Sequence, residues 1–253
     1  LSSCDGGLGR SWGVNTVVPG ETYLHKALPI LFLAIASETV IGQSNLPKGY
    51  KGTPYTDSHH KAAAQVIPGK VECALYDRGG EGVAYHDTDA VNHGSGELNP
   101  ADGSYLHEFR MKEGVDISYT KFHNTPDAID DSPWTIVLPP ANQFYVGWTE
   151  PGEWFNITVD VERSGVYTGN LLYTSNRGGT ISIDVNGKPA SDQITIPTTF
   201  NDADPVPWRQ WHHWNMAPRL VKLQLPAGRS LLTIRIVSGG QMNLAWVDFH
   251  EAH

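Results

Sequence analysis

The C-terminal half of the chain alternates apolar and polar residues in short runs. The run 154–161, Trp-Phe-Asn-Ile-Thr-Val-Asp-Val, has the period of two that is typical of a half-buried strand. Further runs cover 143–148, 166–175, 180–185, 220–225, 231–237 and 243–249. Turn signals separate them, and Asn186-Gly187 is a strong hairpin signal. No long window in this half has a helical period, so the pattern predicts an all-β fold, a sandwich or a barrel.

The preceding part of the chain has fewer regular runs. Residues 66–67 and 71–76 read as strands around a turn at Pro68-Gly69. Residues 77–103 are rich in Gly, Asp, Asn and His, and the chain stays irregular as far as residue 142. This composition predicts one long loop insertion, 86–142, of the kind that often carries function.

An apolar stretch near the N-terminus suggests a secretory signal. Residues 25–36, His-Lys-Ala-Leu-Pro-Ile-Leu-Phe-Leu-Ala-Ile-Ala, combine a weak basic flank, an apolar core and a small-x-small ending. The run is shorter than the roughly 20 apolar residues of a membrane span, and a buried helix is the alternative reading. We therefore expect an irregular leader (1–42), a polar linker or lead-in (43–64) and a β-domain (65–253), in a secreted or extracellular protein. Periplasmic and cell-surface locations are the alternatives.

Charge and cysteine content narrow the choice of partners. The formal net charge is −9, from 18 Lys and Arg against 27 Asp and Glu, and no long basic run is present. A negative chain repels phosphate backbones, so we expect no nucleic-acid partner and, from the short apolar run, no membrane partner. The two cysteines, Cys4 and Cys73, do not make a disulfide framework, and we expect Cys73 to be a buried free thiol.

Three ordered segments resemble family 6 carbohydrate-binding modules, which are β-sandwiches of jelly-roll type attached to secreted polysaccharide-degrading enzymes. The first segment runs from Val71 to Asp77 and continues as Gly-Gly-Glu-Gly-Val-Ala-Tyr at 79–85. The second is Val-Gly-Trp-Thr-Glu-Pro-Gly-Glu-Trp at 146–154, followed by Ser-Gly-Val-Tyr at 164–167. The third combines Trp-Arg-Gln-Trp at 208–211, Leu-Pro-Ala-Gly at 225–228 and Met-Asn-Leu-Ala-Trp at 242–246. The resemblance covers roughly residues 66–250, outside the long insertion.

The resemblance implies a site in which two aromatic rings clasp a sugar and an Asn binds it. Aromatic rings cover the C–H faces of a pyranose, and a few polar groups orient its hydroxyls. The implied residues are Trp148, where the family usually has Tyr, Trp208 and Asn243. We add Trp214 as a possible extension of the site, and Tyr85 and Glu81 from the first loop. Core packing is the alternative for each ring, and the family uses the positions of Trp154 and Trp211 as structural rings; Trp246 is also expected in the core.

Calcium is a possible structural ion. The resemblance implies a site that includes Glu72 and Asp248, although Ala74 stands where the family has a second Glu. Asp87, Asp89 and Asn92 are closely spaced oxygen donors, which suits Ca²⁺, but their spacing is not that of an EF-hand and a solvated loop is the favoured interpretation.

The sequence favours a non-catalytic module over an enzyme. No Gly-x-Ser-x-Gly, His-Glu-x-x-His or Cys-x-x-Cys motif is present, and no two carboxylates are paired by their spacing. We therefore expect binding of plant or algal polysaccharide or oligosaccharide chains. The resemblance also implies a catalytic domain in a longer parent protein. The alternatives are a glycoside hydrolase, or a fragment of one, that uses a carboxylate pair on the same sandwich, and an adhesion or structural domain.

Overall fold

Two β-sheets pack face to face in the computed structural model, which describes residues 43–122 and 128–252. The first sheet has seven strands in the order β1-β8-β14-β10-β11, with β3 beside β8 and β12 beside β10. These strands are β1 (Gln65–Ile67), β3 (Tyr85–His86), β8 (Trp154–Val161), β10 (Gly179–Val185), β11 (Lys188–Pro189), β12 (Ile194–Ile196) and β14 (Gly228–Gly239).

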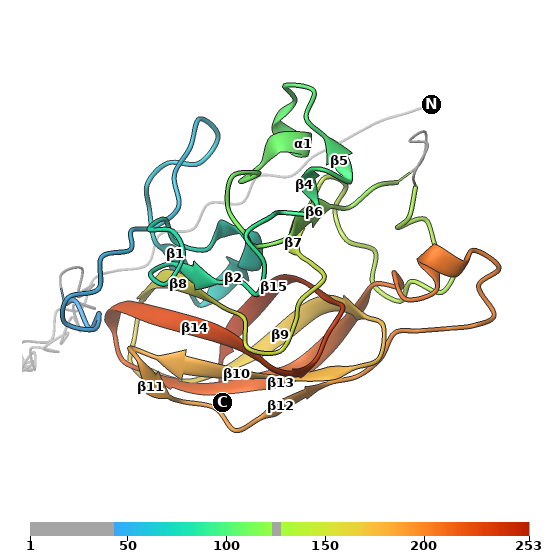
Figure 1. The fold of residues 1–253 in the computed structure, drawn as a ribbon. Coiled ribbons are helices and arrows are strands. Elements are labelled where there is room, and N and C mark those ends of the chain that lie inside the picture. The colour runs from blue at the N-terminus through green and yellow to red at the C-terminus, as the bar shows by residue number, and fades with distance from the viewer. Residues whose placement is uncertain (1–42, 123–127, 253) are drawn as a thin grey trace, which may run out of the picture. The chain divides into compact units, whose positions relative to one another are not determined.

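The second sheet has six strands in the order β13-β9-β15-β7-β6, with β2 also paired to β15. They are β2 (Gly69–Glu72), β6 (Ile117–Tyr119), β7 (Phe144–Val146), β9 (Gly165–Ser175), β13 (Asn215–Leu225) and β15 (Met242–Glu251). Figure 1 shows the long strands of both sheets stacked in two layers. The prediction of a β-sandwich is confirmed.

The alternation along each strand places one set of side chains between the sheets. On β15, Leu244, Val247 and Phe249 point into this core and are fully buried. The register of β15 against β9 shifts between Leu244 and Trp246, which marks a β-bulge. The bulge allows Ala245 and Trp246 to join a second buried cluster with Tyr145, Leu172 and Trp214. The prediction that Trp246 belongs to the core is confirmed.

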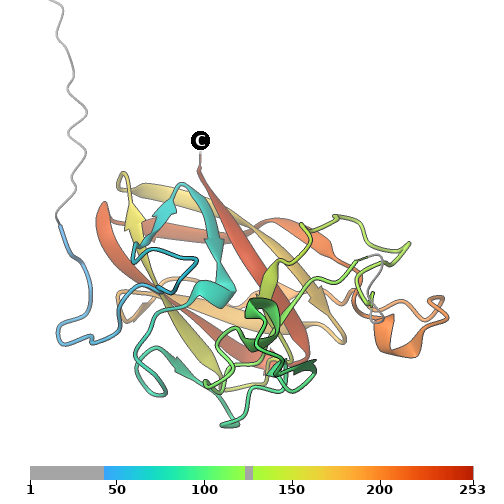
Figure 2. The ribbon, with the colours of Figure 1, turned by 90° about the horizontal axis from the view of Figure 1, so that it is seen from above.

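The insertion is anchored to the sandwich, although it has little regular structure. It contains β4 (Ser95–Gly96), β5 (Asn99–Pro100) and α1 (Tyr105–Glu108), before β6. Arg110 is 8% exposed, and its guanidinium donates to the carbonyl oxygens of Tyr76 at 2.6 Å and Asp77 at 2.9 Å. Figures 1 and 2 show this green segment gathered over β7 and β15 at one end of the sandwich.

The polar segment 43–64, which we expected to be a linker or lead-in, lies against the sandwich. Backbone bonds join Asn45 to Arg229 and Thr53 to Arg78, and the Tyr50 hydroxyl donates to Asp77 at 2.7 Å. All described residues belong to one compact unit, and no described helix has the length and apolar character of a membrane span. The expected leader, 1–42, lies outside the described residues. Cys73 is a buried free thiol, in the 3₁₀ helix η1 (Cys73–Leu75) rather than in a strand.

Candidate functional site

Three indoles surround a hollow of about 530 Å³ at the end of the six-stranded sheet, which we call the tryptophan hollow. Trp148, Trp208 and Trp211 line it. The remaining lining residues come from the insertion, from β6 and β7, from the turns beside β9 and β15, and from the loop before β13: Leu98, Ser118, Lys121, Ile129, Tyr145, Asn176, His212 and Gln241. Its volume is in the range of small-molecule sites. Trp148 and Trp208, which the resemblance implied as the clasp, therefore line the same hollow.

Trp148 occupies an unusual backbone position directly after β7. Its φ is 45°, in the left-handed region that bulky residues rarely adopt. Bonds on both flanks hold it there: Gly147 N donates to Asp116 O at 2.9 Å, and Gln241 N donates to Thr149 O at 2.8 Å. Met242 N also donates to the Thr149 hydroxyl at 3.2 Å. A bulky residue held in this region by its neighbours is characteristic of functional positions.

Trp208 lies on the loop between β12 and β13, in the 3₁₀ helix η2 (Pro207–Arg209). Its side chain is 56% exposed, although the indole is large and apolar. The orange loop lies beside the segment after residue 127 in both views (Figures 1 and 2), and Arg209 Nη1 donates to Asp131 O at 3.0 Å. The loop is thus fixed against the insertion while it exposes its Trp.

Asp204 fixes this loop from within. It is fully buried and accepts hydrogen bonds from Arg209 Nε at 2.8 Å, Arg209 Nη2 at 2.9 Å and Val206 N at 3.0 Å. His213 Nε2 lies 3.0 Å from Asp204 Oδ2. These bonds, first of all that from Arg209, hold the pKa of Asp204 below its ordinary range.

The polar groups of the tryptophan hollow are mostly neutral. The Asn176 amide donates to the side-chain oxygen of Gln241, which fixes two amide groups at its edge. Tyr145 and Ser118 lie deepest, each 1% exposed. Lys121 is cationic, and none of the described lining residues is acidic. The arrangement offers apolar ring faces and hydrogen-bonding groups without a carboxylate.

Two other predicted binding residues lie beneath the surface. Asn243 is fully buried on β15, where its amide donates to the Thr174 hydroxyl at 2.9 Å, and its Oδ1 has no partner. Trp214 is also fully buried, and its Nε1 donates to Asp130 Oδ1 at 2.6 Å. The prediction that Trp214 extends the site is wrong, because its ring completes the second buried cluster. Asn243 does not line the tryptophan hollow.

Trp211 and Trp154 were expected in the core, but both are only half-buried. Trp211 is half-buried and forms part of the hollow. Trp154 is half-buried at the start of β8, where the Arg235 guanidinium lies 5.8 Å from its ring centre. Trp211 follows η2 on the loop, so its ring reaches the hollow instead of the space between the sheets.

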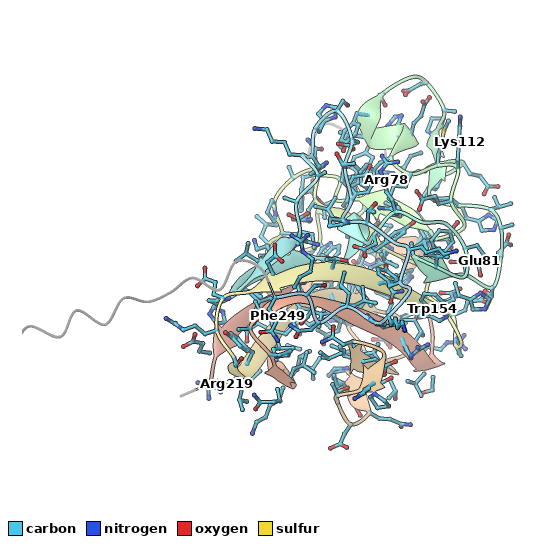
Figure 3. The ribbon with its side chains drawn as sticks, turned by 90° about the vertical axis from the view of Figure 1, so that its left-hand side faces the viewer. Arg78, Glu81, Lys112, Trp154, Arg219 and Phe249 are labelled. Carbon is cyan, nitrogen blue, oxygen red and sulfur yellow. The ribbon has the colours of Figure 1, made fainter. Side chains whose placement is uncertain are left out.

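Four further candidates, Glu81, Tyr85, Asp87 and Asp89, line a separate hollow of about 320 Å³, which we call the acidic hollow. Its other lining residues are Thr88, Ala90, Lys112 and Gly114. Figure 3 shows Glu81 and Lys112 on one side of the sandwich, above the end of β8 at Trp154. Tyr85 is 6% exposed, and its hydroxyl accepts a bond from Gly114 N at 3.0 Å. Glu81 is exposed and lies 2.6 Å from His86 Nδ1. The predicted residues that line a hollow are therefore divided between two separate ones.

Carboxylates around the acidic hollow hold their protons to unusually high pH. Burial raises the pKa of Asp87 and of Asp116 to about 6. Repulsion from Asp89 and Glu81 adds to the shift of Asp87, and repulsion from Asp87 adds to that of Asp116. Burial raises the pKa of Glu153 to about 7, with repulsion from Asp87. Glu153 accepts bonds from Glu150 N at 2.8 Å and from the Thr88 hydroxyl at 2.9 Å.

The described side chains offer little to a calcium ion. Glu72 and Asp248 lie near each other on paired strands, but Lys70 stands opposite Asp248 and its ammonium lies 4.4 Å from the Trp246 ring centre. Asp87 and Asp89 use carboxylate oxygens to accept backbone bonds from Asp89 N and Val91 N. Asn92 is buried and accepts from Gly94, Ser95 and Ile117. Nowhere in the described ranges do three His, Cys, Asp or Glu side chains gather as a metal site, so calcium stays a prediction.

Sequence reasoning missed most of the lining of the tryptophan hollow. Leu98, Ser118, Lys121 and Ile129 lie in or beside the insertion, where no strand pattern fixed their places. For His212 and His213, beside Trp214, the sequence leaves open whether they extend the site or cover an edge. The adjacent Trp211 and His212 both face the hollow, because a loop does not impose the alternation of a strand.

Comparison with solved structures finds similar β-domains of carbohydrate-active proteins. The carbohydrate-binding module CsCBM6-3 from Clostridium stercorarium, in complex with cellobiose, has a TM-score of 0.45 and 10% identity, covering 76% of this chain and 100% of that one. The module CBM6cm-2 of Cellvibrio mixtus lichenase 5A, in complex with cellotriose, has a TM-score of 0.34 and 24% identity, covering 44% and 79%.

A larger enzyme is also similar over part of its length. The family 43 arabinoxylan arabinofuranohydrolase from Bacillus subtilis, in complex with cellotetraose, has a TM-score of 0.42 and 11% identity, and the match covers 75% of this chain and 28% of the enzyme. Comparison with models of known protein families finds no match, and neither does comparison with curated proteins. Family 6 modules, which the sequence resembles, are thus among the solved structures to which this chain is similar.

Proposed function

We propose that this chain is a carbohydrate-binding domain that holds a neutral saccharide in the tryptophan hollow. The observation that carries the proposal is the grouping of Trp148, Trp208 and Trp211 around one hollow, with Trp208 56% exposed. An exposed indole on a fixed loop has an unfavourable contact with water that a stacked sugar ring would remove. The fixed amides of Asn176 and Gln241 would bond the hydroxyls at the sugar's rim.

The electrostatics of the hollow suit such a ligand. The net charge of −9 neither strengthens nor weakens the binding of a neutral sugar. Glucan, xylan and algal chains all present the C–H faces that indoles stack upon, so the plant or algal polysaccharide is proposed as a class. A catalytic domain elsewhere in a longer, secreted parent protein would be brought to its substrate by this binding.

A glycoside hydrolase is the second candidate, favoured by the raised pKa values of Asp87 and Glu153 beside the acidic hollow. A general acid in glycoside hydrolysis needs such a raised pKa, together with a second carboxylate across the scissile bond. The acidic hollow has carboxylates, but its lining has Tyr85 as its one aromatic ring. The tryptophan hollow has the rings and no described acidic residue.

One experiment separates the two candidates. The full chain is titrated by calorimetry with cellotetraose, xylotetraose, a β-1,3-glucan and an agarose oligosaccharide, and each mixture is assayed for reducing sugar. Binding without release supports the binding domain. Release that Glu153→Gln or Asp87→Asn abolishes would establish the enzyme instead, and absence of binding to all four saccharides would overturn the proposal.

A further inference from the structure

The imidazole of His212 lies deep in the tryptophan hollow. His212 lines the hollow next to Trp211, with 4.2 Å between the ring centres, yet the residue is only 2% exposed. A polar ring enclosed this completely normally has both nitrogens in hydrogen bonds, because an unpaired buried polar atom costs about 1–3 kcal/mol.

The adjacent His213, by contrast, has a hydrogen-bond partner at each of its two ring nitrogens. It is 3% exposed, its Nδ1 lies 2.9 Å from Thr199 O, and its Nε2 lies 3.0 Å from Asp204 Oδ2. His212 has the same burial and neither bond. Its Nδ1 is enclosed without a hydrogen-bond partner, and its Nε2 has no partner among the described residues.

Asp130 decides how the proton of His212 is placed. The carboxylate is fully buried, and its Oδ1 lies 3.7 Å from His212 Nδ1. The same carboxylate accepts a bond from Trp214 Nε1 at 2.6 Å and from Lys121 N at 2.7 Å. Of the two neutral tautomers, a negative group at this distance favours the one with its proton on Nδ1, which leaves a lone pair on Nε2.

We propose that His212 Nε2 accepts a hydrogen bond from a hydroxyl of the saccharide in the tryptophan hollow, and that Asp130 is the positioning residue that keeps the proton on Nδ1. This inference rests on the proposed function. It specifies the ligand class further, because the sugar must present a free hydroxyl as a donor to the imidazole that lies beside the Trp211 ring. His212 would then supply the orienting polar contact that the resemblance assigned to Asn243.

The direct test observes the two ring nitrogens of His212 in the full-length protein. Long-range ¹H–¹⁵N correlation spectra of the ¹⁵N-labelled chain are recorded with and without saturating cellotetraose, and again with xylotetraose. We expect the free protein to show His212 neutral with the proton on Nδ1. Saccharide should move the Nε2 resonance, while the nitrogens of His213 stay in place. An unmoved Nε2 resonance in a saturated complex would overturn the inference.

A variant measures the contribution of the bond. His212→Phe keeps a flat ring and removes both nitrogens, and the loss of one net hydrogen bond should weaken cellotetraose or xylotetraose binding about three- to tenfold. If a folded His212→Phe protein bound the saccharide as tightly as the unaltered chain, the inference would be contradicted. Asp130→Asn should shift the proton toward Nε2, visible in the same spectra, and weaken binding; an unchanged tautomer would remove Asp130 from its positioning role.

The outcomes keep this inference separate from the proposed function. Failure of the unaltered chain to bind any of the saccharides contradicts the binding function itself. Binding by the unaltered chain without involvement of His212 contradicts only the inference. If His212→Phe does not fold, the spectra of the unaltered protein still test whether His212 Nε2 bonds the saccharide, because they require no substitution.

Discussion

Asp204 and Arg209 form a bidentate ion pair inside the loop that carries Trp208, with N–O distances of 2.8 and 2.9 Å. The carboxylate is fully buried, so the pair is shielded from water and holds the loop in one shape. The exposed indole of Trp208 is therefore presented by a fixed support, which reduces the ordering cost of binding.

Asp204→Asn should destabilise the protein by about 3 kcal/mol, because it leaves the Arg209 charge without its buried partner. The pKa of Asp204 lies below its ordinary value of 3.8 in the folded protein. Its stabilisation is thus fully present above about pH 4 and is lost as the pH falls further. Urea unfolding at pH 7 measures the loss, with exposed Asp202→Asn as the control. Equal stability of the two variants would contradict this role.

Trp208→Ala should lower saccharide affinity by about 1–3 kcal/mol, because a central aromatic anchor contributes on this scale. The side chain is 56% exposed, so the protein should remain as stable as before. Calorimetric titration measures the affinity, and Phe200→Ala, which removes a 45% exposed ring outside the hollow, is the matched control. Identical affinities for both variants would remove Trp208 from the site.

Asn243→Ala should lower stability by about 1–2 kcal/mol and leave the affinity of the folded protein nearly unchanged. The side chain is buried and bonds Thr174, and it does not line the hollow. Thermal unfolding and titration of the same sample give both quantities. A loss of affinity comparable with that of Trp208→Ala, at unchanged stability, would restore Asn243 to the ligand-binding role that the resemblance implies.

Glu153→Gln should stabilise the protein at pH 8 by on the order of 1 kcal/mol and have little effect at pH 5. Burial raises the pKa of Glu153 from 4.5 to about 7, so the folded state favours the protonated carboxyl. Its contribution is present below about pH 4.5 and is lost as the pH rises through 7. Melting temperatures of Glu153→Gln and of the unaltered protein, measured between pH 5 and pH 8, should show a difference that grows with pH. The exposed Glu162→Gln is the control. A stabilisation that did not depend on pH would contradict the assignment.

The strand positions were largely predictable from the alternation of side chains. The run 154–161 coincides with β8, and the turn at Asn186-Gly187 joins β10 to β11. The sheet to which each strand belongs was not predictable. Strands β9 and β10 follow each other across a short turn, yet they belong to different sheets. A period of two shows which face of a strand is apolar, but it does not select the neighbouring strand, because pairing depends on residues far away in the sequence.

The sequence alone determined the β-sandwich class and the buried thiol of Cys73, and it singled out Trp148 and Trp208, which line one hollow. Only the tertiary structure showed that the tryptophan hollow and the acidic hollow are separate. It also showed that Trp214 and Asn243 are buried, and that Trp211 and His212 line the tryptophan hollow. The physical reason is that these residues lie in loops or beside the bulge of β15, where the local pattern does not fix the direction of a side chain. Their burial and partners depend on long-range contacts, above all those of Asp130 and Asp204.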